Sequence, residues 1–506
     1  MSGAVLTAVL GRGAGVLAVA VLAALSSACT ANAPPRALDH LHACASDDGP
    51  TDALCGSFDV YENREAESGR QIALRIVVLP SVGRDARPDP LVFLAGGPGQ
   101  GAAELAPQIQ RLFRDVQRTR DIVLVDQRGT GRSNPLNCPS SRDSLAGLTE
   151  SDEEGLAHLK RCRDTLSRTS DLRQYTTTIA MDDLDDVRAY LGYEHVNLYG
   201  GSYGTRAALV YVRRHGDRVR AMVLDGVSPP DMRIPLFAAR DAQRALDKMF
   251  ADCEGDPSCR AAFPGLGTRV RALIAKLDAT PSVQQIAHPR TGIVEEIAVR
   301  GRLVASIVFS ALYSPITASI LPTLLENAEH DDFKGLLALA LAGEAGQDNM
   351  SVGMQLSVLC SEDSGRSSGQ DLLREASGSV FSTHLMVGQV AACQFWPKGI
   401  VDPDYYAPLT SDVPTLVLSG DIDPVTPPIW GHAVAMHLPR ALHLTAPGTG
   451  HGVAGTACGS RIIGQFLERG TTDDLDTSCL HAIRRPGFFL TPAGPEPLPT
   501  QKAMTR

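Results

Sequence analysis

The clearest chemistry in this chain centres on Ser202, which lies in the Gly-x-Ser-x-Gly sequence of residues 200–204. A short apolar run at residues 196–199 precedes it, and a helical pattern at residues 206–215 follows it. A serine on such a sharp strand-to-helix turn is lifted clear of the sheet edge, and the flanking glycines permit the turn. The first N–H groups of the helix then point to where negative charge develops on a substrate carbonyl. The pattern predicts a serine nucleophile; a chance glycine turn is the alternative.

A serine nucleophile needs a base, and the base needs an orienting carboxylate. On a nucleophile turn of this kind, the partners follow in the chain order serine, acid, histidine. Of the 13 histidines, His451 is predicted to be the base because it lies in a glycine-rich loop after an apolar run. Two carboxylates follow the apolar run at residues 415–418. Asp423 is preferred because Pro424 fixes the next turn, and Asp421, which would instead cap that turn, is the alternative.

An oxyanion hole requires two N–H donors near the nucleophile. The backbone N–H of Tyr203, directly after the serine, is predicted to be the first. The second is expected from the Ala-Gly-Gly-Pro-Gly loop at residues 95–99, which follows the apolar run at residues 91–94. We predict that Gly97 provides this donor, and an ordinary tight turn is the alternative for the loop.

Continuous apolar runs predict strands that are buried on both faces of a sheet. These runs are residues 91–94, 122–125, 196–199, 221–224 and 415–418, with a weaker one at 442–444. Two antiparallel strands are predicted before them, at residues 56–61 and 72–79. A helical pattern at residues 181–191, ended by Gly192, lies between two of the runs. This alternation indicates an α/β fold with a mostly parallel central sheet.

The alternation stops near Pro229, and strand signals resume at Pro414. From residue 234 to about residue 344 the pattern is nearly all helical. The predicted helices are residues 234–253, 269–278, 301–313, 318–330 and 333–341. A helical block between two parts of one sheet predicts a cap over the carboxyl edge of that sheet.

These patterns divide the chain into six parts. They are a signal peptide at residues 1–28, a tether and N-terminal extension at 29–54, the first part of the core at 55–230, a mostly helical cap at 231–405, the second part of the core at 406–490 and a proline-rich tail at 491–506 that is predicted to be disordered.

The composition is that of a globular protein. The 506 residues suffice for more than one domain, and the contents of 43% hydrophobic and 21% charged residues are ordinary. The net charge of −10 is spread without a long acidic run, and no basic patch with interleaved aromatic residues occurs, which argues against nucleic-acid binding. Because the sequence lacks Cys-x-x-Cys and paired Cys/His spacings, we expect no metal site, and the predicted chemistry requires no cofactor.

The N-terminal segment predicts export. Residues 4–25 are almost wholly apolar, interrupted by Arg12, and small residues lead to Cys29. The Leu-Ser-Ser-Ala-Cys end resembles a bacterial lipoprotein signal, in which Cys29 is lipidated after cleavage. Cleavage after Ala28 by an ordinary signal peptidase and an uncleaved membrane anchor are the alternatives. We expect a lipid-anchored or periplasmic protein of the cell envelope, or a secreted one.

Ten of the eleven cysteines remain when Cys29 is set aside. An even number in an exported chain predicts a set of disulfides. Pairing neighbours in the sequence gives Cys44–Cys55, Cys138–Cys162, Cys253–Cys259, Cys360–Cys393 and Cys458–Cys479.

Several of these motifs together resemble the proline iminopeptidase and tripeptidyl aminopeptidase group of α/β-hydrolases. The matching stretches are residues 95–99, 126–133 (Asp-Gln-Arg-Gly-Thr-Gly-Arg-Ser), 200–205, 393–397 (Cys-Gln-Phe-Trp-Pro) and 420–424, within a resemblance that runs from about Cys55 to Cys479. The resemblance implies an α/β-hydrolase fold with an inserted cap. It also implies that Ser202 forms an acyl-enzyme while releasing short peptides or single residues from a free N-terminus. Ala95 departs from the histidine usual in the group, which puts the rigidity of its loop in question.

An aminopeptidase must recognise a cationic amine, and carboxylates do so through charge-assisted hydrogen bonds. Glu362 and Asp363, in the predicted cap, are candidates for this role, and a solvated acidic turn is the alternative. Asp126 and Arg128 are predicted to be a structural pair at a strand end. A carboxylic ester hydrolase would use the same three catalytic residues, and an exported binding protein with an inactive site is a further alternative. The sequence thus predicts peptide substrates and leaves the oligomeric state open.

Overall fold

The computed structural model describes residues 37–45, 49–50, 52–139, 145, 151–288, 291–344, 350–491 and 493–495. The predicted signal peptide, Cys29 and most of the predicted tail lie outside the described residues. The chain divides into two units, Met1–His40 and Leu41–Arg506. In the first, the described residues form one short 3-10 turn, Ala37–His40. The second unit contains everything described below.

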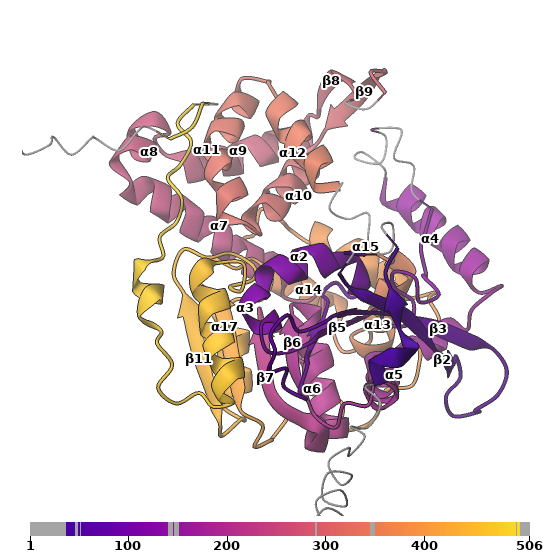
Figure 1. Ribbon diagram of the computed structural model, residues 1–506. Helices are drawn as coiled ribbons and strands as arrows, with labels where there is room; N and C mark the ends of the chain where they lie inside the picture. Colours follow the sequence, from indigo (N-terminus) through magenta and orange to yellow (C-terminus); the bar gives the residue numbers. More distant parts are fainter. Residues whose placement is uncertain are drawn as a thin grey trace, which may run out of the picture. The chain divides into compact units, whose positions relative to one another are not determined.

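A nine-stranded sheet forms the centre of the second unit (Figure 1), in the order β1-β2-β3-β5-β4-β6-β7-β10-β11. The strands are β1 His42–Ala43, β2 Leu54–Tyr61, β3 Gln71–Leu79, β4 Leu91–Leu94, β5 Ile122–Val125, β6 Val196–Gly201, β7 Val219–Asp225, β10 Thr415–Gly420 and β11 Ala441–Ala446. From β5 to β11 every neighbouring pair is parallel, whereas β1, β2 and β3 are antiparallel to their neighbours. Each predicted strand is present, and the apolar runs that became β4 and β5 are buried throughout.

Helices cover both faces of this sheet. On one face, α2 (Ala106–Leu112), α3 (Arg114–Gln117) and α17 (Ala457–Arg469) share a hydrophobic core with alternate residues of the strands. On the other face, α5 (Thr177–Tyr190) packs against α6 (Tyr203–His215). Helix α4 (Asp152–Leu166) lies before α5, and α16 (Pro428–Ala435) packs against β10 and β11. This is the layered arrangement predicted from the strand–helix alternation.

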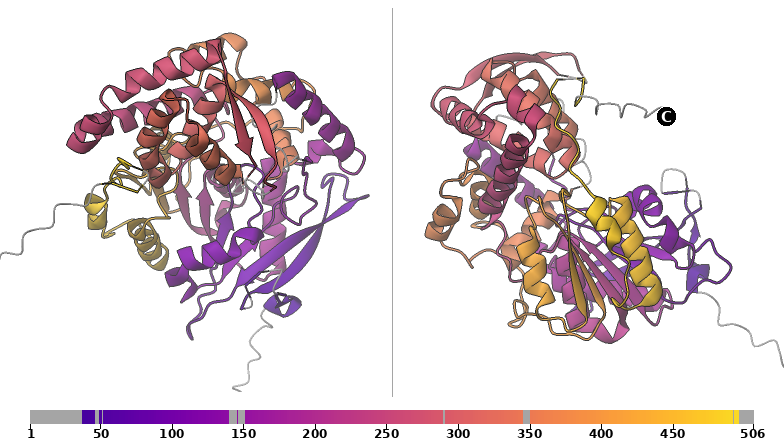
Figure 2. Two further views of the ribbon diagram at one scale, coloured as in Figure 1. Left: turned by 90° about the horizontal axis from the view of Figure 1, so that it is seen from above. Right: turned by 90° about the vertical axis from the view of Figure 1, so that its left-hand side faces the viewer.

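The helices of the segment between β7 and β10 are α7 Ala238–Gly255, α8 Pro257–Ala262, α9 Leu266–Ala279, α10 Gly301–Leu312, α11 Pro315–Glu329, α12 Lys334–Glu344, α13 Val352–Glu362, α14 Gly369–Ala376 and α15 His384–Ala392. Helices α7 to α12 lie beyond the sheet (Figure 2), while α13 and α15 pack against α4. Apolar side chains of α7, α9, α10 and α11 form a hydrophobic core of their own. We call this inserted segment the cap.

The mostly helical cap also contains a β-hairpin that the predicted elements did not include. Strands β8 (Ser282–Ala287) and β9 (Val294–Val299) form an antiparallel hairpin. Along β8, half-buried and exposed residues alternate, as in a strand with one solvated face. The only large apolar residues of β8 are Val283 and Ile286, which stand three positions apart. That spacing is typical of a helix, so the apolar pattern did not predict a strand here.

Five disulfides are present, and they join the sequence neighbours predicted above. Two of them, Cys253–Cys259 and Cys360–Cys393, lie within the cap. Cys458–Cys479 ties the start of α17 to the 3-10 turn Ser478–Ala482. All ten cysteines that remain besides Cys29 are therefore paired.

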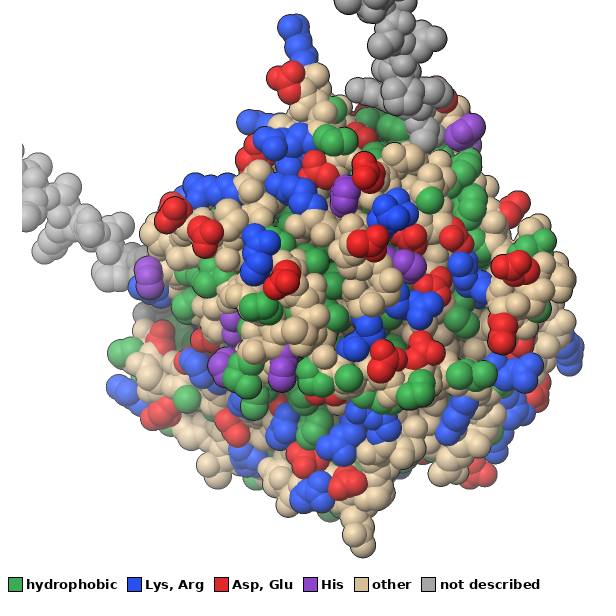
Figure 3. Space-filling model, turned by 90° about the horizontal axis from the view of Figure 1, so that it is seen from below, with side chains coloured by type: hydrophobic (Ala, Val, Ile, Leu, Met, Phe, Trp, Pro, Cys, Tyr) green, Lys and Arg blue, Asp and Glu red, His purple; other side chains and the backbone are tan. Residues whose placement is uncertain are grey.

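The surface carries charges of both signs. On the face drawn in Figure 3, acidic and basic side chains are interspersed and no uniformly basic patch stands out. Within the described part of the chain, no helix combines the length and the apolar character needed to cross a bilayer.

Candidate active site

Ser202 lies at the turn between β6 and α6, with φ +56° and ψ −125°. A non-glycine residue in this region costs about 1–3 kcal/mol, so the surrounding structure must impose the turn. A Cβ atom on Gly200 would lie 2.3 Å from the carbonyl oxygen of Gly204, and one on Gly204 would lie 2.1 Å from that of Leu94. Both flanking positions therefore require glycine. The Ser202 N–H donates to the carbonyl of Asp225 at 2.9 Å, which fixes the turn to the adjacent strand.

Asp423 and His451 come together at the ends of β10 and β11. Asp423 Oδ2 lies 2.8 Å from His451 Nδ1. The carboxylate is fully buried, and it also accepts from the backbone N–H groups of Val425 and Thr426, each at 2.8 Å. Of the two carboxylates considered from the sequence, the structure thus places Asp423, and not Asp421, against His451.

Thr426 is a further part of this arrangement that the sequence reasoning missed. Its hydroxyl donates to Asp423 Oδ2 at 2.7 Å and lies 3.1 Å from His451 Nδ1. The only available signal was a hydroxyl residue three positions after the acid, a spacing at which an aspartate caps its own turn. The threonine holds the carboxylate in the orientation that faces the imidazole.

The surroundings lower the pKa of Asp423 and raise the pKa of His451, so both groups favour their charged forms. Burial acts to raise the pKa of Asp423, but the charge and hydrogen bond of His451 and two backbone N–H groups hold it below its ordinary value. Burial acts to lower the pKa of His451, but the charge and hydrogen bond of Asp423 and the charge of Asp225 raise it above 6.5. A carboxylate that stays ionised can stabilise an imidazolium as it forms.

A second buried carboxylate, Asp225, supports the histidine loop. Its side chain accepts from the N–H groups of Val453 and Ala454, each at 2.8 Å, and from the Tyr199 hydroxyl at 2.9 Å. Burial raises the pKa of Asp225, although these hydrogen bonds act to lower it. Asp225 was not predicted as a site residue, although an acidic residue ending a buried parallel strand was visible in the sequence.

The glycine loop after β4 lies directly against the nucleophile. A Cβ atom on Gly96 would lie 3.3 Å from Ser202 Cβ, so the loop and the serine are in van der Waals contact. Gly97 has φ +113°, a region that favours glycine. Tyr203 is the first residue of α6, as the predicted strand-to-helix turn at the nucleophile requires. The structure therefore brings together the two segments from which the oxyanion donors were predicted, while the donor roles of the Gly97 and Tyr203 N–H groups stay predictions.

Asp126 binds the segment that follows this glycine loop. Its carboxylate accepts from the N–H groups of Ala103 and Arg132, at 2.8 and 3.0 Å. Asp126 and Arg128 were predicted to form a pair, and that pairing is wrong. Arg128 is fully buried and donates to both carboxylate oxygens of Asp183, at 2.5 and 2.8 Å. Both residues have structural contacts, but they bind different parts of the chain.

The cap meets the histidine loop at Tyr313, immediately after α10. The Tyr313 carbonyl accepts the His451 N–H at 2.8 Å, and the two rings meet edge to face with centroids 5.2 Å apart. A Cβ atom on Gly450 would lie 2.3 Å from that same carbonyl oxygen. This glycine therefore permits the cap to pack on the loop that carries His451.

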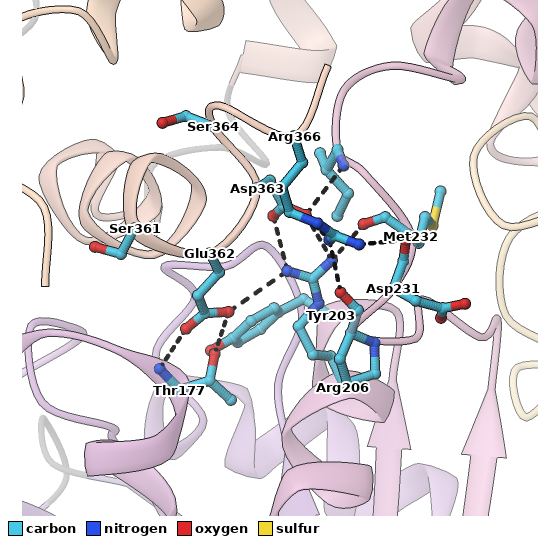
Figure 4. A network of polar contacts seen from close by, with 12 residues as sticks. Thr177, Tyr203, Arg206, Asp231, Met232, Ser361, Glu362, Asp363, Ser364 and Arg366 are labelled. Carbon is cyan, nitrogen blue, oxygen red and sulfur yellow. Dashed lines mark hydrogen bonds and ion pairs between the residues drawn. The ribbon is translucent and has the colours of Figure 1, made fainter. Parts of the chain in front are cut away.

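Glu362 and Asp363 lie at the end of α13 in a buried ion cluster (Figure 4). Asp363 binds Arg206 of α6 through both oxygens, at 2.8 and 3.3 Å. Glu362 accepts from the backbone N–H and hydroxyl of Thr177, at 2.7 and 2.9 Å, and from the Tyr405 hydroxyl. In this structure neither carboxylate is available to a substrate amine, so the amine-binding role stays a prediction that no described contact supports.

Two other histidines lie on the elements that follow β10 in the chain. His432 is on α16, and His443 is on β11, where its Nε2 lies 3.0 Å from Ser419 Oγ. Among the described residues, no group of three or more His, Cys, Asp or Glu side chains is arranged to hold a metal ion.

Comparisons with known proteins agree with this geometry. Residues 89–261 match the family model described as alpha/beta hydrolase fold, and residues 378–479 match the one described as TAP-like protein. The chain has the α/β-hydrolase fold. The resemblance stated from the sequence motifs is thus confirmed, and this α/β-hydrolase is an enzyme of the serine-hydrolase class.

Characterised relatives of this α/β-hydrolase cover most of its length. It is 29% identical to the serine protease Hip1 of Mycobacterium tuberculosis, over 85% of this chain and 88% of the relative. It is 25% identical to a tripeptidyl aminopeptidase of Streptomyces lividans, over 88% and 87%. A proline iminopeptidase of Neisseria gonorrhoeae is 32% identical, over 27% of this chain and 32% of the relative.

Solved structures give weaker likenesses. A proline iminopeptidase from Mycobacterium smegmatis superposes with a TM-score of 0.34 at 16% identity, covering 82% of this chain and 98% of the other. An esterase from Exiguobacterium antarcticum superposes with a TM-score of 0.34 at 14% identity, covering 79% and 95%.

Proposed function

We propose that this α/β-hydrolase is an exported serine aminopeptidase that releases short peptides or single residues from the free N-terminus of peptides. The observations that carry the proposal are the Asp423–His451 hydrogen bond of 2.8 Å and the strained turn that holds Ser202. Two relatives that span most of the chain are named serine protease and tripeptidyl aminopeptidase, which supports peptides as the substrate class.

The proposed reaction is acyl transfer to Ser202. Because His451 Nδ1 donates its hydrogen to Asp423, Nε2 is the nitrogen that receives the Ser202 hydroxyl proton. Ser202 Oγ attacks the peptide carbonyl, and the tetrahedral oxyanion is held by the N–H groups of Tyr203 and Gly97. The imidazolium then gives its proton to the leaving amine, and an acyl-enzyme remains. Water, activated by the same histidine, releases the N-terminal fragment.

Electrostatics favour the charged intermediate of this reaction. Asp423 stays ionised over the whole working pH range because its pKa is held below its ordinary value. The negative charges of Asp423 and Asp225 both favour the imidazolium, as the raised pKa of His451 shows. Three donors besides His451 hold Asp423 still, so little reorganisation is needed when charge develops.

The direct test is the Ser202→Ala variant. It removes the nucleophile and leaves Gly201 and Tyr203 in place, so the fold is expected to be retained and peptide hydrolysis to be abolished. A fluorophosphonate probe should label the wild-type protein at Ser202 and leave the variant unlabelled. Unchanged hydrolysis by the variant would contradict the proposal.

A further inference from the structure

The glycine loop beside Ser202 is held by the cap. The Ser351 N–H donates to the carbonyl of Gly99 at 2.9 Å, and Met350 and Gln100 form an antiparallel bridge. We call Met350 and Ser351, which directly precede α13, the brace. It joins a loop of the first core segment to a residue pair about 250 positions later in the chain.

Contacts in this bridge are close. A Cβ atom on Gly99 would lie 2.7 Å from the Ser351 carbonyl oxygen, and one on Gly97 would lie 3.0 Å from the Met350 sulfur. The loop thus has glycine at the points where the brace presses on it. A loop so rich in glycine has few side chains to restrict its backbone, and Ala95 has no polar side chain to do so.

The brace is itself fixed to the core. Ser351 is buried, and its hydroxyl donates to Asn137 Oδ1 at 2.7 Å. Two residues later the Gly353 N–H donates to the Leu136 carbonyl at 2.8 Å. The start of α13 therefore has two anchors on residues 136 and 137, one within the brace and one just after it.

The other end of α13 reaches the second predicted oxyanion donor. The Thr177 hydroxyl donates to Glu362 Oε2, so the Tyr203 hydroxyl, 2.7 Å away, must donate to Thr177 (Figure 4). Tyr203, Thr177 and Glu362 are all buried. This chain of hydrogen bonds fixes the side chain of Tyr203, whose backbone N–H is the predicted oxyanion donor.

We propose that α13 and its brace form a positioning element that sets both halves of the oxyanion hole. The brace holds the Gly97 loop, in place of the missing histidine at position 95, and Glu362 holds Tyr203 through Thr177. The inference rests on the proposed function. It makes the cap a part of the catalytic machinery, since donors must lie within a fraction of an ångström of their working positions.

Ser351→Pro breaks the brace at its N–H, and the proline Cδ that replaces the hydrogen also displaces the Gly99 carbonyl. Ser351 has φ −77°, which proline can adopt, while Met350 before it is in the extended conformation that proline favours. The variant removes the N–H that binds Gly99. Ser351→Ala is the matched control, because it keeps this N–H and loses only the hydroxyl bond to Asn137.

We expect Ser351→Pro to lower kcat by roughly 10- to 100-fold with KM nearly unchanged, as for a misplaced oxyanion donor. Fluorophosphonate labelling of Ser202 should slow in parallel, and amide hydrogen exchange at residues 96–100 should accelerate. Ser351→Ala keeps the N–H and removes one anchor of the brace, so its losses in kcat and in protection from exchange should be clearly smaller than those of Ser351→Pro. At the other end of α13, Thr177→Val should lower kcat, while Thr177→Ser, which keeps the hydroxyl, should restore it.

Two outcomes separate this inference from the proposed function. If Ser351→Pro shows wild-type kcat and wild-type exchange at residues 96–100, the brace does not position the loop. If wild-type protein hydrolyses no peptide and takes no fluorophosphonate, the proposed function fails. In that case, amide hydrogen exchange at residues 96–100 in Ser351→Pro and Ser351→Ala still tests whether the brace positions the loop.

Discussion

At the scale of single residues, the predicted catalytic group depends on which of two carboxylates faces the histidine. Asp421 and Asp423 follow the same strand two positions apart, so sequence patterning alone left both open. In the structure Asp423 accepts four hydrogen bonds, one of them from His451. Burial raises the pKa of Asp421, against the charge of Lys248 and two backbone N–H groups.

Substituting the two aspartates separately tests this assignment. Asp423→Asn should lower kcat by about 10⁴-fold, since an asparagine there favours the wrong imidazole tautomer. Asp421→Asn is the matched control and should retain nearly full activity. Steady-state kinetics on one peptide anilide suffices. Equal losses in the two variants would contradict the assignment.

The dependence of kcat/KM on pH follows from the raised pKa of His451. The base must be neutral to accept the Ser202 proton, so kcat/KM should fall as the pH drops through the pKa of His451. Because Asp423 and Asp225 raise that pKa, the midpoint of the acid limb should lie above 6.5. A midpoint below 6.5 in a kcat/KM–pH profile would mean that these carboxylates do not act on the histidine as described.

At the scale of elements, Arg206 joins the nucleophile helix α6 to the cap. It is fully buried, and besides Asp363 it donates to the carbonyl of Met232 at 3.0 Å. Burial raises the pKa of both Glu362 and Asp363, and the charge of Arg206 acts against that rise. The charge of one guanidinium thus stabilises the ionised forms of two buried carboxylates.

Arg206→Met should therefore destabilise the fold by about 3–5 kcal/mol, because it leaves buried charge without its partner. The deficit should shrink as the pH is lowered, since protonated carboxyls need no counter-charge. Arg214→Met, on the exposed face of the same helix, removes the pair with Asp182 and should lose less than about 1 kcal/mol. Denaturant unfolding at two pH values measures both losses. Equal losses would show that the buried cluster adds no more stability than an exposed ion pair.

The sequence was most informative where one periodicity dominates. Runs such as residues 91–94 and 122–125 are buried on both faces, and each is a strand. Strand β8 was missed because its two apolar residues have helical spacing. Asp225 and the brace were beyond sequence reasoning for another reason. Their roles come from contacts with residues about 230 and 250 positions away, which no local pattern encodes.

At the scale of the whole molecule, five disulfides join segments in both the core and the cap. Cross-linking stabilises mainly by restricting the unfolded chain, and the effect grows with the length of the closed loop. The bridge Cys360–Cys393 spans 33 positions and Cys253–Cys259 spans six.

Replacing both cysteines of a bridge by alanine tests this ranking within one layer of the structure. From loop length, removing Cys360–Cys393 should cost about 3.7 kcal/mol and removing Cys253–Cys259 about 2.2 kcal/mol. The melting temperatures of the two double variants should differ in that order. The reverse order would indicate that local packing, and not chain entropy, controls the stability of the cap.

The export proposal is tested at Cys29, which lies outside the described residues. If the cysteine carries a lipid, Cys29→Ser should move the protein from the membrane fraction of the producing cells to the soluble fraction. A variant that stays with membranes would contradict lipid anchoring. Sequencing the N-terminus of the mature wild-type protein would separate cleavage before Cys29 from an uncleaved anchor.

The central claim is that the enzyme removes residues from a free N-terminus. The most direct measurement compares hydrolysis of free-amine and N-acetylated forms of the same aminoacyl and peptidyl anilides, including proline and Ala-Ala-Pro, beside p-nitrophenyl esters. Ser202→Ala serves as the blank. We predict turnover of the free-amine anilides and little turnover of the acetylated ones. Cleavage of the esters without any cleavage of the anilides would contradict the claim and assign the same site to an esterase.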